Sequence, residues 1–197
     1  MNKYTSQKIK SIIGQYATAY QAIEELQENS EAMPKGDQKA AAIGEYYAYR
    51  YCQRHYPKGS KVKFAEHSQK GWSLCVTEPG KTTTIQVKTV SGFSAKRKTN
   101  AITPKGWDQL FVVCLDKDFL PTGFWIFDKK QDFKDHIKSF TLTPPKYDKG
   151  AFMHGSDVFS GKSNDCNALR KSCGIPLIDS TSRYLRNLSK LGTDTTR

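Results

Sequence analysis

The stretch KGWSLCVTEPGKTTTIQVK, residues 70–88, decides the fold, because it contains two alternating patterns with a turn between them. Apolar side chains alternate with polar or small ones over residues 72–77 and again over 84–88. Such alternation is typical of half-buried β-strands. Pro79 and Gly80 are residues that favour a tight turn. The stretch therefore predicts a β-hairpin.

The second strand of this hairpin carries two polar side chains, Gln86 and Lys88, on one face, because residues two apart in a strand point the same way. Ser73 on the first strand is placed to face them. An amide, an ammonium group and a hydroxyl would then share one patch, which is where we look for chemistry. The alternative is the solvated face of an antiparallel hairpin, where glutamine, lysine and serine are common.

The order of segments around the hairpin resembles the core of the PD-(D/E)xK nuclease superfamily. A Gly44-Glu45 pair in an expected helix comes first, then a strand that begins with Gly-aromatic, then Ile-Gln-Val-Lys-Thr-Val-Ser over residues 85–91. The later segments GWDQLFVV and GFWI resemble the corresponding part of small restriction endonuclease-like members, and the resemblance covers residues 38 to 128. It implies an α/β fold, a central mixed β-sheet flanked by helices, similar to restriction endonucleases.

The resemblance also implies a catalytic site around one or two divalent metal ions. Glu45 matches the helix glutamate of the family, Gln86 the variable D/E/Q position and Lys88 the lysine. Ser73 stands where the family has a metal-binding aspartate, and a neutral hydroxyl is a poorer ligand for a hard cation than a carboxylate. The implied metal ligands are Glu45, Gln86 and the Ser73 position. Mg²⁺ is the expected ion, with Mn²⁺ as a substitute.

Three explanations fit the serine at position 73. Glu66 or Glu78, each a few residues from the hairpin core, replaces the missing ligand and preserves catalysis. Alternatively, the chain is a degenerate member that binds nucleic acid without cutting it. In the third explanation, position 73 carries a substitution made to inactivate the enzyme. The sequence does not separate these.

Net charge indicates nucleic acid as the partner, since 31 Lys and Arg residues face 19 Asp and Glu residues, a balance of +12. Double-stranded DNA is the expected form. The alternative is a generally basic protein, or one that docks on an anionic membrane or an acidic protein. Lys96, Arg97 and Lys98 follow the second hairpin strand, and His67 and Lys70 precede the first, so these five are the expected nucleic-acid contacts. A loop histidine such as His67 is often merely exposed.

The 197 residues are interpreted as an N-terminal helix at 1–35, a nuclease-like core at 36–140 and a basic C-terminal extension at 141–197 packed on the same domain. Helical spacing predicts helices over 5–29 and 38–55, the second with Asp37 as its N-cap.

Beyond the hairpin, continuous apolar runs predict two neighbouring strands at 109–115 and 119–127. Residues 131–140 have a helical pattern, and 141–150 are rich in turn residues. A polar connection over 160–171 leads into a short helix, and 180–191 has the pattern of a final helix. The last third of the chain would read the major groove, mediate dimerisation or only cap the sheet.

Other features narrow the class of protein. The sequence has neither an apolar run long enough to span a membrane nor a hydrophobic signal peptide, so a cytoplasmic protein with no membrane partner is expected. The five cysteines include no C-x-x-C pair, so a structural zinc site is not expected and the thiols should be reduced.

The sequence thus predicts a restriction-type DNA endonuclease that depends on a divalent metal. A homodimer is expected if it cuts both strands. The main alternative is a catalytically inactive DNA-binding module on the same fold. An adaptor for an acidic protein partner is a third interpretation.

Overall fold

The computed structural model describes residues 5–29, 40–65, 71–133, 139–148, 151–153, 157–159 and 161–178. In this part of the chain the helices are α1 (Ser6–Asn29), α2 (Ala40–His55), α3 (Lys129–Asp132) and α4 (Cys166–Cys173), with a short 3₁₀ turn at Asp157–Phe159. The strands are β1 (Lys61–Phe64), β2 (Leu74–Glu78), β3 (Lys81–Val90), β4 (Gln109–Leu115), β5 (Pro121–Asp128), β6 (Lys146–Asp148) and β7 (Ala151–Met153).

The first five strands form one mixed sheet in the order β1-β2-β3-β4-β5. All neighbouring strands in it are antiparallel except β3 and β4, which run parallel. A parallel pair requires a crossover, and here the segment between β3 and β4, residues 91–108, returns the chain to the start of β4 without a helix. Strands β6 and β7 form a separate two-stranded sheet.

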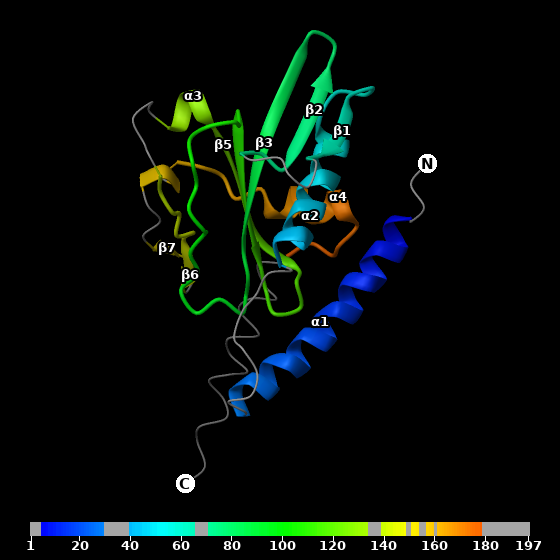
Figure 1. Cartoon of the computed structure of the whole chain (residues 1–197), viewed down its shortest axis with the longest axis vertical. Coiled ribbons are helices and arrows are strands. Elements are labelled where there is room, and N and C mark those ends of the chain that lie inside the picture. The colour runs from blue at the N-terminus through cyan, green and yellow to red at the C-terminus, as the bar shows by residue number, and fades with distance from the viewer. Residues whose placement is uncertain are drawn as a thin grey trace.

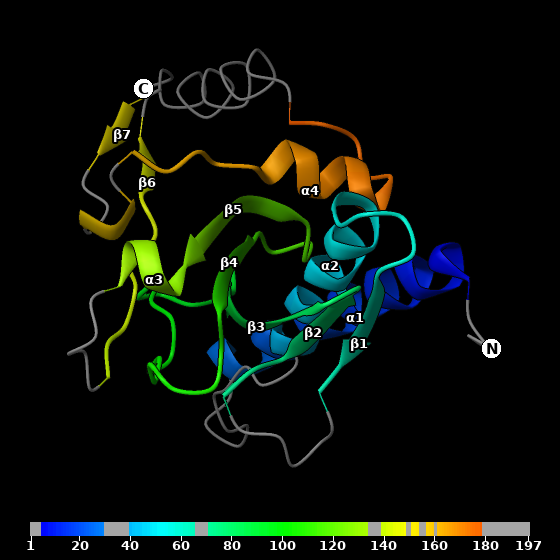
Figure 2. The ribbon, with the colours of Figure 1, turned by 90° about the horizontal axis from the view of Figure 1, so that it is seen from above.

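Both faces of the sheet are covered. Helices α1 and α2 lie on one side, as Figure 2 shows. On the other side the cover comes from the crossover between β3 and β4 and from Phe133, Leu142 and Phe159, because α3 itself buries no residue. The core under α1, α2 and α4 includes Ile85 and Val87 of β3. The core on the other face includes Val90 of β3 and Trp125 of β5. Because β3 contributes to both cores, its side chains alternate between two buried layers rather than between core and solvent.

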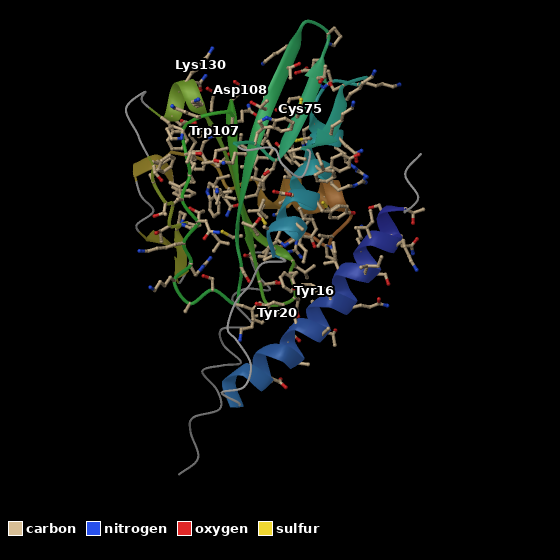
Figure 3. All side chains as sticks on the ribbon, in the orientation of Figure 1. Tyr16, Tyr20, Cys75, Trp107, Asp108 and Lys130 are labelled. Carbon is tan, nitrogen blue, oxygen red and sulfur yellow. The ribbon has the colours of Figure 1, made fainter. Side chains whose placement is uncertain are left out.

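Helix α1 lies diagonally across one end of this arrangement (Figure 1) and is joined to it by aromatic side chains. Tyr16 and Tyr20 lie on the side of α1 that is turned toward the rest of the chain (Figure 3), and both rings contact Phe119. Gln21 donates hydrogen bonds to the Lys117 carbonyl and to Asp118, each at 3.2 Å. Helix α1 is therefore attached to the loop between β4 and β5.

The structure confirms the predicted fold class, an α/β protein with a central mixed sheet and flanking helices. It also confirms the hairpin with its turn at Pro79 and Gly80, the strand at 109–115 and its antiparallel neighbour. All five cysteines are free thiols. The proposed division at residues 35 and 140 stays a prediction.

Two predictions for the last third need correction. The helix predicted over 131–140 is confirmed only at its start, because α3 contains Gln131 and Asp132 but stops there, and Phe140 forms a β-bridge with Ile102. The turn-rich segment 141–150 contains the strand β6. The N-cap at Asp37 and the helix at 180–191 lie outside the described residues. Within the described residues, no helix combines the length and the apolar character that crossing a membrane requires.

Candidate active site

The candidate site lies beside the start of β2. Strand β3 extends past this point, so one edge of its second half has no strand partner. The pairing of β2 with β3 starts at Leu74 opposite Ile85, whereas β3 continues to Val90 beside β4. Ser73 lies at this fork, where its backbone N–H donates to the Ile85 carbonyl at 2.8 Å. The Ser73 hydroxyl accepts a hydrogen bond from the Val87 N–H at 3.4 Å. This hydroxyl takes the place of the backbone acceptor that a longer β2 would provide for Val87.

Helix α2 reaches this fork because Gly44 allows close packing on the sheet. A Cβ atom placed at Gly44 would overlap the side chain of Thr89 in β3. Only glycine leaves enough room for the helix backbone at this distance. Glu45, the next residue, is thereby brought to the edge of β3 that β2 leaves open.

Glu45 interacts with both Ser73 and Lys88 at this edge. Burial raises the pKa of the Glu45 carboxyl, and this effect exceeds the opposing effects of a hydrogen bond with the Ser73 side chain and of the Lys88 charge. Burial likewise lowers the pKa of Lys88, while the negative charge of Glu45 raises it. The structure thus brings together three of the four predicted catalytic residues, each from a different element or its border.

Lys88 is also held by a contact on the face of the sheet that lies away from α2. Its Nζ donates a hydrogen bond to the Ala101 carbonyl at 2.9 Å. Ala101 belongs to the crossover between β3 and β4, and the crossover is anchored nearby through the bridge of Ile102 with Phe140. The role of Ala101 has no signal in the sequence, because a backbone carbonyl is present at every residue.

Gln86 is buried, with 9% of its surface exposed, on the same face of β3 as Lys88. Its Oε1 atom is buried and makes no hydrogen bond with the described residues. Buried polar atoms are nearly always paired, so an acceptor of this kind indicates a place for a water or an ion. The alternative of a solvated hairpin face is therefore wrong for Gln86.

These residues can be tested against the metal that the resemblance implies. Glu45 offers a carboxylate, Gln86 an unpaired amide oxygen and Ser73 a hydroxyl. Mg²⁺ often takes only one or two carboxylates and completes its shell with water and substrate phosphate. An oxygen-liganded divalent ion fits this donor set. No group of three or more His, Cys, Asp or Glu side chains within the described residues is arranged to hold a metal.

Glu78 is not placed to replace the missing aspartate. It is paired with Lys81 at the turn of the hairpin, whereas Ser73 precedes the opposite end of β2. Five residues of extended strand separate them, which is roughly 17 Å. Glu78 lies near Tyr56, and the Glu78 charge helps to raise the pKa of Tyr56. Glu66, the other candidate, lies outside the described residues.

The predicted nucleic-acid contacts fall into three groups. His67 and Lys70 lie outside the described residues. Lys96 and Lys98 are exposed in the loop that follows β3. Arg97 is half-buried, with a positive φ of 42°, and its charge lies close enough to the Cys114 thiol to lower its pKa against the stronger effect of burial. The assignment of all five residues as nucleic-acid contacts stays a prediction. For Arg97, the interaction with the buried Cys114 instead indicates a structural role.

Comparisons with known proteins identify no family for this chain. No family model matches the sequence, and no curated protein matches it. Among solved structures, the chain is similar to a bacterial homing endonuclease, I-Ssp6803I, at 16% sequence identity and a TM-score of 0.40. The match covers 71% of this chain and 96% of that one. Similarity at this level carries no argument, so the functional proposal rests on the site.

Proposed function

We propose that this chain is a metal-dependent, restriction-type DNA endonuclease whose catalytic residues are Glu45, Ser73, Gln86 and Lys88. The observation that carries the proposal is that Glu45 is hydrogen-bonded to the Ser73 side chain and also lies close enough to Lys88 for each charge to affect the pKa of the other. Their identities and order match those of the PD-(D/E)xK pattern, apart from the serine. The basic charge of the chain supports DNA as the substrate.

Lys88 is suited to act on a phosphate. An ammonium group has three N–H donors, and the described contacts use one of them on the Ala101 carbonyl. The others are available for a phosphate oxygen, where they would stabilise the negative charge that develops during hydrolysis. The lowered pKa of Lys88 also favours its exchange of a proton with attacking water.

Glu45, Gln86 and Ser73 would hold the divalent cation, Mg²⁺ or Mn²⁺. A bound cation would polarise the phosphate and lower the pKa of the attacking water. Glu45 provides the negative charge, and its raised pKa marks a carboxylate whose charge is not fully compensated by its protein neighbours. Gln86 contributes a neutral oxygen that the described protein contacts leave unpaired.

A specific observation favours a second candidate, an inactive nuclease-fold module that binds DNA. The described site has one carboxylate, Glu45, because position 73 is a serine and Glu78 lies at the far end of β2. In that case DNA binding would persist without Mg²⁺, and replacing Glu45 would change the affinity little.

The proposal is tested by cleavage of mixed plasmid and genomic DNA in Mg²⁺ and in Mn²⁺, with EDTA as the metal-free control. The proteins are the natural chain, Lys88→Ala, Ser73→Asp and, as a matched control, Lys81→Ala on the same strand. We expect the natural chain and Lys81→Ala to cut, and Lys88→Ala not to cut.

Other outcomes identify the alternatives. Cleavage by Ser73→Asp alone would mean an inactivated nuclease whose site is otherwise intact. Binding without cleavage by any variant would overturn the enzyme proposal in favour of the binding module. No binding to duplex DNA at all would favour an acidic protein partner. If both strands are cut, sedimentation should show a homodimer.

A further inference from the structure

Strands β1, β2 and β3 share a polar face on the side of the sheet that lies away from α2. Their other face is apolar, since Val62, Leu74 and Ile85 belong to the core under α2 or pack against it. Side chains alternate along a strand, so the residues between these apolar ones point the opposite way. The strand register aligns them in two rows across the three strands, Lys63 with Cys75 and Thr84, and Lys61 with Thr77 and Thr82. We call these six residues the lysine–threonine face.

The lysine–threonine face is open at the hairpin turn and leads to the candidate site. Its two lysines, Thr77 and Thr82 are exposed, and its other two residues are half-buried. Beyond Thr84, β3 continues on the same side with the buried Gln86 and the half-buried Lys88. Strands β2 and β3 extend past β4 and β5 at the turn (Figure 1). A ligand on this face would therefore run from an exposed end of the sheet to the proposed catalytic lysine.

The charge of this face is positive. None of its six residues is acidic, and Glu78 at the hairpin turn lies on the opposite side, near Tyr56. Asp108, which precedes β4, borders the face, and its Oδ2 atom accepts hydrogen bonds from the N–H and the hydroxyl of Thr84 at 2.9 and 2.8 Å. Within the described part of the chain, neither lysine of the face has a carboxylate at ion-pair distance. An anionic ligand would supply the missing negative charge.

The distance from the lysines to the candidate site suits a polyanion. Neighbouring strands lie about 4.8 Å apart, and a strand rises about 3.3 Å per residue. Lys63 lies two strands across from Thr84, and Lys88 is four residues further along β3. The Cα atoms of Lys63 and Lys88 are therefore about 16 Å apart. Each strand of DNA carries a phosphate every 3.4 Å or so of its axis, so a DNA backbone spans this distance, whereas a single nucleotide does not.

We propose that the lysine–threonine face binds the phosphate backbone of DNA on one side of the phosphate held at Lys88. The proposal deepens the proposed function and rests on it, because the phosphate at Lys88 is then the scissile one. Lys61 and Lys63 neutralise backbone phosphates, and the threonine hydroxyls donate hydrogen bonds to phosphate oxygens. Such contacts position DNA without reading its bases, so this face accepts any sequence. Exposed lysines on an edge strand also hinder its pairing with another chain, a role that does not involve DNA.

The experiment measures binding of a labelled duplex of about 20 base pairs by fluorescence anisotropy in EDTA, at four salt concentrations. Lys61→Gln with Lys63→Gln is compared with a control, Lys8→Gln with Lys81→Gln. The control removes the same charge from two exposed lysines, one on α1 and one that alternates with Thr82 toward the α2 side of the sheet. The first pair should reduce the slope of log affinity against log salt by about 1.8 and weaken binding at least about tenfold near 0.1 M salt. The control should change both little, and Lys61→Arg with Lys63→Arg should keep the natural slope because arginine retains the charge.

Cleavage in Mg²⁺ provides a second measurement on the same variants. Lys61 and Lys63 lie away from the reacting phosphate, so they contribute equally to binding of the substrate and of the transition state. Their replacement by glutamine should raise KM and leave kcat within about twofold of the natural value.

Equal slopes for the two glutamine pairs would overturn the proposal and leave the lysines with edge protection alone. Competition by polyglutamate as strong as that by DNA would overturn it in favour of an acidic protein partner, and absence of duplex binding by the natural chain would also overturn it. None of these results decides the nuclease proposal, which depends on plasmid cleavage with and without Lys88→Ala. If the slopes change as expected but no variant cuts, the nuclease proposal fails and the face stands as the DNA-binding surface of an inactive module.

Discussion

Gly44 of α2 lies so close to Thr89 of β3 that a methyl group on the glycine would overlap the threonine side chain. Glu45 directly follows Gly44, and Lys88 directly precedes Thr89. One contact between a helix and a strand therefore sets the separation of the two charged groups of the site. This explains why the glycine and the glutamate occur together.

Replacement of Gly44 by alanine should destabilise the protein and reduce DNA cleavage. The added methyl group forces α2 away from β3, and such overpacking costs about 1–3 kcal/mol of unfolding free energy. Gly14→Ala in α1 is the matched control, because an added methyl group there meets nothing within 4 Å. It should be neutral or stabilising by up to about 1 kcal/mol. Urea unfolding measures both, and equal effects would contradict the packing argument.

Glu45→Gln should raise the thermal stability of the protein at neutral pH. Burial raises the pKa of Glu45 in the folded state, so the folded chain binds this proton more tightly than the unfolded chain does. Stability is then lost as pH rises from the unfolded pKa of about 4.3 through the higher folded value. The variant has no such loss. Its Tm should exceed that of the natural chain at about pH 7.5, and the difference should vanish near pH 3.5.

Differential scanning fluorimetry across this pH range provides the check. Ser73→Ala is the companion variant, since it removes the hydroxyl that lowers the pKa of Glu45. It should lower stability at neutral pH and change it least in acid. A Tm of Glu45→Gln below that of the natural chain at every pH would show that the carboxylate stabilises the fold.

Ser73→Asp should make the thermal stability of the protein depend strongly on Mg²⁺. Without metal, the new carboxylate lies beside Glu45, and two like charges at a half-buried site destabilise the folded state. With metal, both become ligands, and binding to the folded state alone stabilises by about 2.7 kcal/mol at a concentration of 100 Kd. The rise in Tm on adding Mg²⁺ should exceed that of the natural chain. Equal shifts would mean that the ion does not bind at position 73.

Local patterns were enough to predict four of the five strands of the main sheet, whereas β1 (Lys61–Phe64) was not predicted. The hairpin, the strand at 109–115 and the first two helices follow from the spacing of apolar residues, and the structure has them at nearly the same bounds. The segment 131–140 was harder, because its pattern is helical, yet Phe140 packs against Phe133 and pairs with Ile102. A contact across 38 residues of chain overrides a local preference, and no window of sequence contains it.

For the candidate site, the sequence predicted the relative positions of some residues but not their surroundings. The sequence placed Gln86 and Lys88 on one face of a strand, which the structure bears out. Burial of that face depends on the crossover returning over it, and Ala101 reaches Lys88 only through that return. The distance of Glu78 from the site likewise follows from the strand register, which fixes it at the turn.

Lys96 and Lys98 should contribute to the salt dependence of DNA binding, whereas Arg97 should contribute to stability. The two lysines are exposed, and each contact with a phosphate of duplex DNA adds about 0.9 to the negative slope of log affinity against log salt. Lys96→Gln with Lys98→Gln should therefore reduce the slope by about 1.8 if both lysines bind phosphates.

Arg97 lies close enough to the buried Cys114 thiol to affect its pKa. Arg97→Gln should lower the Tm and leave the slope nearly unchanged. Titrations at four salt concentrations measure the slopes, and a loss of slope confined to Arg97→Gln would reverse the assignment.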